Sequence, residues 1–299
     1  GILALGLPIF WGGFWAGVNY AASFVLIMLL HWTVATKQPA MTAPAMAAAL
    51  DGGARTDEEI EAFVDKVAQL IRSQAAGILG NVLVCGPLVL LVQLAFVLVL
   101  GTPPVGDDEA RHVLETLGLV GPTPLYAALT GVLLFASSLV AGWSENFFVF
   151  HRLASAIAWN PRIVATLGAA RARRWAGWAR GNVSGLAANV SLGLMLGLVP
   201  AIGAFFGLPL EVRHVTLSAG QLGAAAGALG VEALGMPALW SCLAALVVTA
   251  MLNVGVSFWC AFKVALRSRG VRLAERERIE AAIRARLRRD PASFLWPPR

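Results

Sequence analysis

Residues 77–100 read GILGNVLVCGPLVLLVQLAFVLVL and contain no charged side chain. An α-helix rises about 1.5 Å per residue, so a run of this length matches the roughly 30 Å apolar core of a bilayer. A scan outward from this stretch finds four more apolar runs of about 20 residues. We therefore expect five membrane-spanning helices, at residues 11–33, 77–100, 124–143, 184–206 and 238–261.

The composition of the whole chain indicates the same class. Of the 299 residues, 58% are hydrophobic and 13% are charged. A soluble domain carries about 25% charged residues, so too little charge is present to cover a water-soluble core of this size. The apolar fraction is also far too high for a disordered chain. The predicted fold class is all-α, a polytopic helical membrane protein with additional amphipathic helices on the cytoplasmic side.

The basic residues predict the orientation of the spans. All but two of the 23 Lys and Arg residues lie in the connections 37–75 and 145–183 and in the tail 263–299. Basic residues accumulate on the cytoplasmic side of a membrane, so these segments and the C-terminus are expected in the cytoplasm. The two exceptions, Arg111 and Arg213, lie in the alternate connections.

One segment does not fit the pattern of spans. Residues 215–231, VTLSAGQLGAAAGALGV, carry no charge but form a short run rich in small residues. If this run crossed the membrane, the basic tail would lie outside. We expect a re-entrant or surface helix packed on the spans, in which Gly223 and Gly227 allow close helix approach.

The first long cytoplasmic connection contains a clear helix start. Thr56 and Glu59 form a capping box, followed by apolar residues at helical spacing, so we expect a surface helix along the membrane that leads into the second span. A second helix is expected in the tail, with a basic second half. The predicted domains are a transmembrane domain at 1–266 and a basic cytoplasmic tail helix at 267–299.

A short internal repeat relates two halves of the transmembrane domain, at about 12–100 and 120–206. AGILGNV at 76–82 resembles SGLAANV at 184–190, so Asn81 and Asn189 are equivalent. Carboxamides also lie in two other spans, at Asn19 and Asn253. A buried amide in lipid needs a partner, so we expect these residues to bind neighbouring helices. The alternative is a polar seam that lines a substrate path.

Two short polar pairs flank the spans. Lys37 and Gln38 follow the first span and are expected to anchor it on the cytoplasmic side. Glu145 and Asn146 follow the third span at the same offset and form a candidate motif with them. Arg213 and His214 are the outer Arg–His pair, which we expect to be exposed at the surface.

The segment 162–180 mixes arginines with Trp175 and Trp178. Such a pattern is typical of an amphipathic helix that lies on anionic lipid. It also occurs where tryptophans stack on nucleic acid bases, but the position between two membrane spans favours lipid. We expect anionic lipid headgroups as partners of the basic helices and no nucleic acid. Association of copies into a homo-oligomer stays open.

No cofactor or metal is expected. The three cysteines, Cys85, Cys242 and Cys260, lie in apolar runs without metal-ligand spacing and are expected as small buried side chains. No charged residue lies deep in a span, which argues against ion-coupled transport by these residues.

Several long stretches resemble the bacterial transmembrane family labelled site-specific recombinase. They are NYAASFVLIMLLHWTVATKQPAMTA at 19–43, ENFFVFHRL at 145–153, AIAWNPR at 156–162, and GNVSGLAANVSLGLMLGLVPAIGAFFGLPLEVRHVTLSAG at 181–220. The resemblance implies a multi-pass protein of the bacterial inner membrane. Members are about twice as long, and the chain opens with Gly1 in an apolar stretch, so we expect an N-terminal part that could act as a partner of this one.

The residues themselves argue against recombinase chemistry. A tyrosine recombinase needs a Tyr nucleophile beside an Arg–His–Arg cluster, and both tyrosines, Tyr20 and Tyr126, lie in or beside spans. We expect a non-enzymatic membrane protein acting as a scaffold or in envelope lipid or solute handling. The alternatives are a transporter built on the repeat, and a literal DNA recombinase with its catalytic groups in the N-terminal part.

Overall fold

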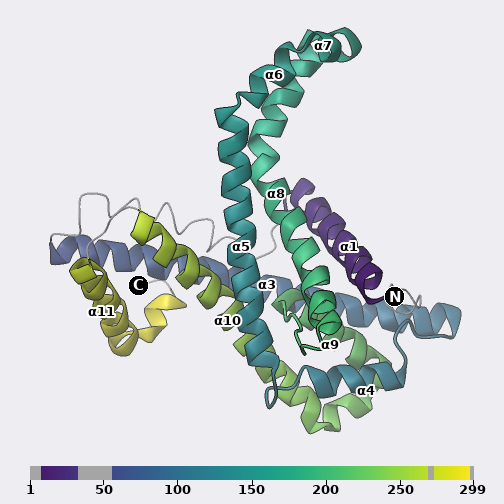
Figure 1. Cartoon of the computed structure of the whole chain (residues 1–299). Coiled ribbons are helices and arrows are strands. Elements are labelled where there is room, and N and C mark those ends of the chain that lie inside the picture. The colour runs from purple at the N-terminus through teal and green to yellow at the C-terminus, as the bar shows by residue number, and fades with distance from the viewer. Residues whose placement is uncertain (1–7, 33–55, 269–272, 297–299) are drawn as a thin grey trace. The chain divides into compact units, whose positions relative to one another are not determined.

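The computed structural model of the chain describes residues 8–32, 56–268 and 273–296 (Figure 1). Within these ranges all regular structure is helical. The helices are α1 (Ile9–Leu29), α3 (Asp57–Leu100), α4 (Asp107–Thr116), α5 (Thr123–Phe150), α6 (Leu153–Trp159), α7 (Pro161–Leu167), α8 (Ala169–Phe205), α9 (Val215–Leu229), α10 (Pro237–Ser268) and α11 (Leu273–Arg289), with 3-10 turns η2 (Gly230–Gly235) and η3 (Pro291–Phe294). The all-α prediction is confirmed.

The five predicted apolar runs each fall in a long helix. Among the described residues, α1, α3, α5, α8 and α10 are long and apolar enough to cross a membrane. Four of them extend well beyond their apolar run: α3 and α8 at their N-terminal ends, and α5 and α10 at their C-terminal ends. The prediction of five helices with the length and composition of membrane spans is therefore confirmed.

The chain forms two compact units. Unit 1 comprises residues 1–33 and 135–211, and unit 2 comprises residues 34–134 and 212–299. Helix α5 contributes its second half to unit 1 and its first half to unit 2.

In unit 1, α1 packs on α8 in the antiparallel direction through facing glycines. A Cβ atom on Gly13 would lie 2.8 Å from the carbonyl oxygen of Gly197, and a Cβ atom on Gly197 would overlap the backbone of Gly17. Only glycine lets the two backbones approach so closely, as the GxxxG spacing on both helices predicts. The short helices α6 and α7 pack on the first half of α8, where Ala172 is buried.

In unit 2, α9 lies against α3, α4 and α10. Its buried side chains form one apolar core with those of α4 and α10, around Leu114, Leu222 and Leu246. A Cβ atom on Gly223 would overlap the backbone of Gly86, which confirms the predicted close approach. With 15 residues, α9 is about 22 Å long, too short for a span. It packs on α3, α4 and α10, as expected for a helix packed on the spans, and its position as a re-entrant or a surface helix stays a prediction.

Helix α3 joins the predicted surface helix and the second span without a break over 44 residues. The capping box is confirmed, because the Thr56 side chain accepts from the Glu59 N–H at 3.2 Å and the Glu59 carboxylate accepts from the Thr56 N–H at 3.2 Å. The helix ends at Gly101, whose φ of 70° is left-handed. One unbroken helix continues directly into the apolar run, as expected for a helix that leads into the second span, and its position along the membrane surface stays a prediction.

Candidate functional site

A buried polar cluster joins α5, α9 and α10 in unit 2. Its centre is Asn253 in α10, which has no exposed surface. The Asn253 side-chain nitrogen donates to the carbonyl oxygens of Ala127 and Arg213, both at 2.9 Å, and its oxygen accepts from the Val215 N–H at 3.1 Å. One carboxamide therefore binds three backbone groups on two other segments. Asn253 thus has the interhelical role that we expected for the four asparagines, and the printed bonds show that role for this residue.

Thr130 of α5 also binds the backbone of the segment that leads into α9. Its hydroxyl, also without exposed surface, accepts from the Arg213 N–H at 2.8 Å and donates to the Tyr126 carbonyl at 2.8 Å. His214 is the N-cap of α9 and has extended backbone angles. The backbone N–H groups of its neighbours Arg213 and Val215 therefore have no acceptor within the helix. Thr130 and Asn253 supply the acceptors instead, as buried backbone groups require.

The Arg213–His214 pair is not exposed as we expected. His214 retains 1% of its surface and Arg213 is half-buried. The Arg213 guanidinium donates to the carbonyls of Thr116 and Val212, each at 3.3 Å, and lies 5.6 Å from the centre of the Tyr126 ring. The surface expectation is wrong because these residues lead into α9, which packs inside unit 2.

The other candidate residues lie apart from this cluster. Asn19 is exposed on α1, and Asn81 is half-buried on α3. Asn189 of α8 is buried and donates to the carbonyl of Gly185 in its own helix at 2.8 Å. Asn81 belongs to unit 2 and Asn189 to unit 1.

The cytoplasmic motif is only partly within the described residues. Glu145 and Asn146 are exposed on α5, five and four residues before the helix ends at Phe150. Lys37 and Gln38 lie outside the described residues, so the proposed pairing between the two motifs stays a prediction.

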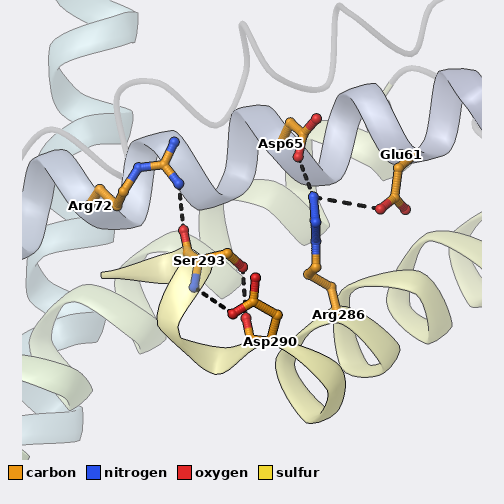
Figure 2. A network of polar contacts seen from close by, with 6 residues as sticks. All are labelled: Glu61, Asp65, Arg72, Arg286, Asp290 and Ser293. Carbon is orange, nitrogen blue, oxygen red and sulfur yellow. Dashed lines mark hydrogen bonds and ion pairs between the residues drawn. The ribbon is translucent and has the colours of Figure 1, made fainter. Parts of the chain in front are cut away.

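A second polar cluster, on the first half of α3, holds the C-terminal helix. Arg286 of α11 contacts Asp65 and lies 3.5 Å from Glu61 (Figure 2). The hydrogen bond to Asp65 raises the pKa of Arg286 further above its already high usual value. Near the chain end, Arg72 of α3 donates to the carbonyl of Ser293. We call α11, η3 and their contacts on α3 the tail clasp.

The tail clasp has an apolar core of its own. Val64 and Val67 of α3 pack with Ile279 of α11, Phe294 of η3 and Leu266 of α10, all less than a tenth exposed. An open cleft of about 330 Å³ lies beside it and is lined by side chains of both charge signs and by alanines: Asp57, Ile60, Glu61, Arg278, Ala281, Ala282, Ala285, Arg286 and Arg289. Because both carboxylates and guanidinium groups line the cleft, its lining does not favour ligands of one charge sign.

The sequence did not identify the role of Thr130 or the pairing of Arg286 with Asp65. Thr130 lies in an apolar run without any signal that separates it from other threonines. The pairing of Arg286 with Asp65 joins residues 221 positions apart. The first residues of α3, at 57–65, are rich in carboxylates and the second half of α11 is basic, and this opposite charge was the signal available in the sequence. In the parts of the chain that the structure describes, no three His, Cys, Asp or Glu side chains gather as metal ligands.

Among known protein families, a family model described as site-specific recombinase matches residues 1–297. No curated protein and no solved structure matches the chain.

Proposed function

We propose, from the premise that the chain belongs to the site-specific recombinase family, that it is an integral protein of the bacterial inner membrane with a non-enzymatic role. In this role it acts as a membrane scaffold or in the handling of envelope lipid or solutes.

Insertion in a membrane is supported by the surfaces of the long helices. On α3 the apolar window is only 6% buried within the protein. Large apolar side chains there are open to the surroundings, with Leu83 at 68% and Leu98 at 85% exposure. A contiguous surface of this kind is unfavourable in water and favourable in lipid.

The proposed topology has five crossings with the C-terminus in the cytoplasm. The basic first half of α8 and the tail clasp then lie on the same side, in agreement with the positive-inside rule. Helix α9 is re-entrant in this arrangement, because it is too short to cross and starts beside Asn253 within the apolar run of α10. Non-helical backbone at membrane depth is tolerated only where protein groups satisfy it, as Asn253 and Thr130 do here.

The observation that best supports the non-enzymatic role is that the side chain of Asn253 is fully engaged in hydrogen bonds to backbone. Its oxygen and both of its N–H groups bind backbone atoms. A carboxamide committed in this way holds helices together and has little capacity left to bind a substrate. Such buried asparagines in membrane proteins typically fix helix packing.

Strand exchange by these residues is disfavoured by the surroundings of the tyrosines. Tyr126 is 8% exposed and its ring lies beneath Arg213, so a DNA phosphate in water would not reach its hydroxyl group. Tyr20 lies in the apolar helix α1. A tyrosine nucleophile needs an accessible hydroxyl together with cationic groups around the scissile phosphate.

A transporter is the second candidate, favoured by one observation. Transporters often build substrate sites where a broken helix begins at mid-membrane, and α9 begins in such a position in the proposed topology. The literal recombinase, with catalytic groups in an N-terminal part, is the third alternative.

Cysteine accessibility separates the first two functions. Thr216, in the first turn of α9, is changed to Cys in a variant whose three native cysteines are replaced by Ala. A scaffold with a dry core predicts no reaction of the membrane-inserted protein with a charged, membrane-impermeant maleimide. Rapid labelling from either side of the membrane would indicate a water-filled path and favour the transporter.

Insertion itself is tested by alkaline carbonate extraction of membranes from expressing cells. An integral protein remains in the pellet, whereas release of the full chain into the supernatant would contradict the proposal. A peripheral membrane protein, treated in parallel, serves as the extracted control.

A further inference from the structure

The end of unit 1 formed by α6, α7 and the first half of α8 carries only positive charge. Between Asn146 and Leu210 the sequence has no Asp or Glu. The arginines of this segment are all exposed: Arg152, Arg162, Arg171, Arg173, Arg174 and Arg180. A concentration of cations without neighbouring carboxylates indicates an anionic partner.

Two of the arginines share a face of α8 with two tryptophans. Residues 171, 174, 175 and 178 follow the spacing i, i+3, i+4, i+7, which places them on one side of the helix. Trp175 is 55% exposed and Trp178 is 42% exposed, and their rings meet edge to face at 5.6 Å. We call Arg171, Arg174, Trp175 and Trp178 the Arg–Trp face.

The buried side of the same helix segment points elsewhere. Ala172 has no exposed surface and Ala176 has 5%, and both α6 and α7 pack on α8 (Figure 1). The Arg–Trp face is therefore different from the buried face that contains Ala172 and Ala176, and the described elements of unit 1 leave it more exposed. Exposed indole rings beside arginines require a partner that accepts both apolar and cationic groups.

The position along α8 identifies that partner. The helix runs unbroken from Ala169 to Phe205, so Trp178 lies six residues before the apolar run that starts at residue 184. This corresponds to about 9 Å along the helix axis. The headgroup region begins at the edge of the apolar core, where Trp is enriched and where anionic lipids attract Lys and Arg.

We propose that the Arg–Trp face binds the anionic phospholipid headgroups of the cytoplasmic leaflet. The indole ring of Trp178 then lies next to the headgroups. Arg174 and Arg171 start about 15 Å and 20 Å before the apolar run, so their long side chains extend toward the membrane to bring the guanidinium groups to phosphate oxygens. Further exposed aromatic residues of the same connection, Phe150 at 82% and Trp159 at 69%, are suited to the same interface. The inference rests on the proposed insertion of the chain in a membrane.

The test measures lipid binding by the full chain purified in detergent. Phosphatidylglycerol is titrated and the bound lipids are counted by native mass spectrometry, with phosphatidylcholine as the uncharged reference. The double variant R171Q/R174Q is expected to lose about tenfold in affinity for phosphatidylglycerol, because each cation near an anionic surface contributes substantially. R171K/R174K, which keeps both charges, should retain most of the binding.

The matched control removes the same charge from exposed arginines of the same connection that lie outside the Arg–Trp face. Arg162 of α7 and Arg173 of α8 are both exposed, and along the chain neither lies nearer to the apolar run than Arg174, so R162Q/R173Q is expected to remain within about twofold of the unmodified protein. An equal loss in both double variants would overturn the proposal, since it would show only general attraction between charges. Circular dichroism of each variant checks that the helices are intact.

Two further outcomes would also overturn the lipid site. One is unchanged phosphatidylglycerol binding by R171Q/R174Q. The other is binding of a DNA duplex that R171Q/R174Q abolishes while lipid binding persists, which would assign the face to nucleic acid. The carbonate extraction separates this failure from that of the proposed function: a variant that stays in the membrane pellet but binds lipid normally contradicts only the lipid site.

Discussion

The side-chain oxygen of Asn253, in α10, accepts a hydrogen bond from the backbone N–H of Val215, the first residue of α9, at 3.1 Å. Asn253 lies 16 residues after Pro237, the first residue of α10, which is about 24 Å along the helix. The start of α9 is therefore held beside the interior of a long apolar helix and far from its first turn. This bond, with those from Asn253 to Ala127 and Arg213, is the structural basis for treating α9 as re-entrant.

Replacement of Asn253 by Ala is expected to destabilise the protein by about 2 kcal/mol, because it leaves buried backbone groups on two segments unpaired. The measurement is unfolding of the detergent-solubilised chain in sodium dodecyl sulfate, followed by circular dichroism. Asn19→Ala is the matched control, since Asn19 is exposed on α1, and should change stability by less than about 0.5 kcal/mol. Equal effects of the two substitutions would contradict the account of the cluster.

Replacement of Gly197 by Leu is expected to separate α1 from α8. A side chain at this position would overlap the backbone of Gly13 and Gly17, so a loss of about 1–3 kcal/mol or more is predicted. Gly177→Leu in the same helix meets nothing within 4 Å and serves as the control. Thermal denaturation in detergent gives the comparison, and a stable Gly197→Leu variant would show that the two helices do not pack through this face.

A charge swap tests the tail clasp. Arg286→Asp places a carboxylate beside Asp65 and Glu61, and is expected to release α11 so that a protease removes the tail faster. Restoring opposite charges with Arg286→Asp and Asp65→Arg together should recover part of the protection, worth about 1 kcal/mol for a partly exposed pair. Arg288→Asp, at an exposed position of α11, is the control. Rapid proteolysis of the unmodified chain would mean that the clasp does not form.

Substitution of the tyrosines tests the literal reading of the family description. Tyr126→Phe and Tyr20→Phe should leave any recombination phenotype unchanged, since neither hydroxyl lies in an accessible cationic site. Binding of DNA by the purified chain should be weak, without sequence preference, and should fall steeply with salt. A covalent protein–DNA adduct at either tyrosine would refute this expectation.

Much of the fold followed from local patterns. The apolar runs, the capping box at Thr56 and the spacing of Gly223 and Gly227 each act through neighbouring residues, so their consequences can be predicted from the sequence. For the short uncharged run that forms α9, the sequence favoured a re-entrant or surface helix packed on the spans. These features required no knowledge of which helices meet.

The site was less predictable because its bonds join distant segments. Asn253 was a candidate as one of four equivalent carboxamides, and only tertiary packing distinguishes it from exposed Asn19. The Arg213–His214 pair looked like a surface feature because charged residues usually remain in water. Its burial follows from the packing of α9 inside unit 2, which depends on contacts of α9 with α3, α4 and α10.

The most direct test of the central claim, five crossings with a re-entrant α9, is a fusion of alkaline phosphatase after Arg289. The enzyme is active only outside the cytoplasm, so the account predicts an inactive fusion, and a fluorescent product when green fluorescent protein is fused at the same position. A fusion after Gly121, in the connection between α4 and α5, should be active and serves as the positive control. An active phosphatase after Arg289, with normal membrane insertion, would contradict the account and indicate that α9 crosses the membrane.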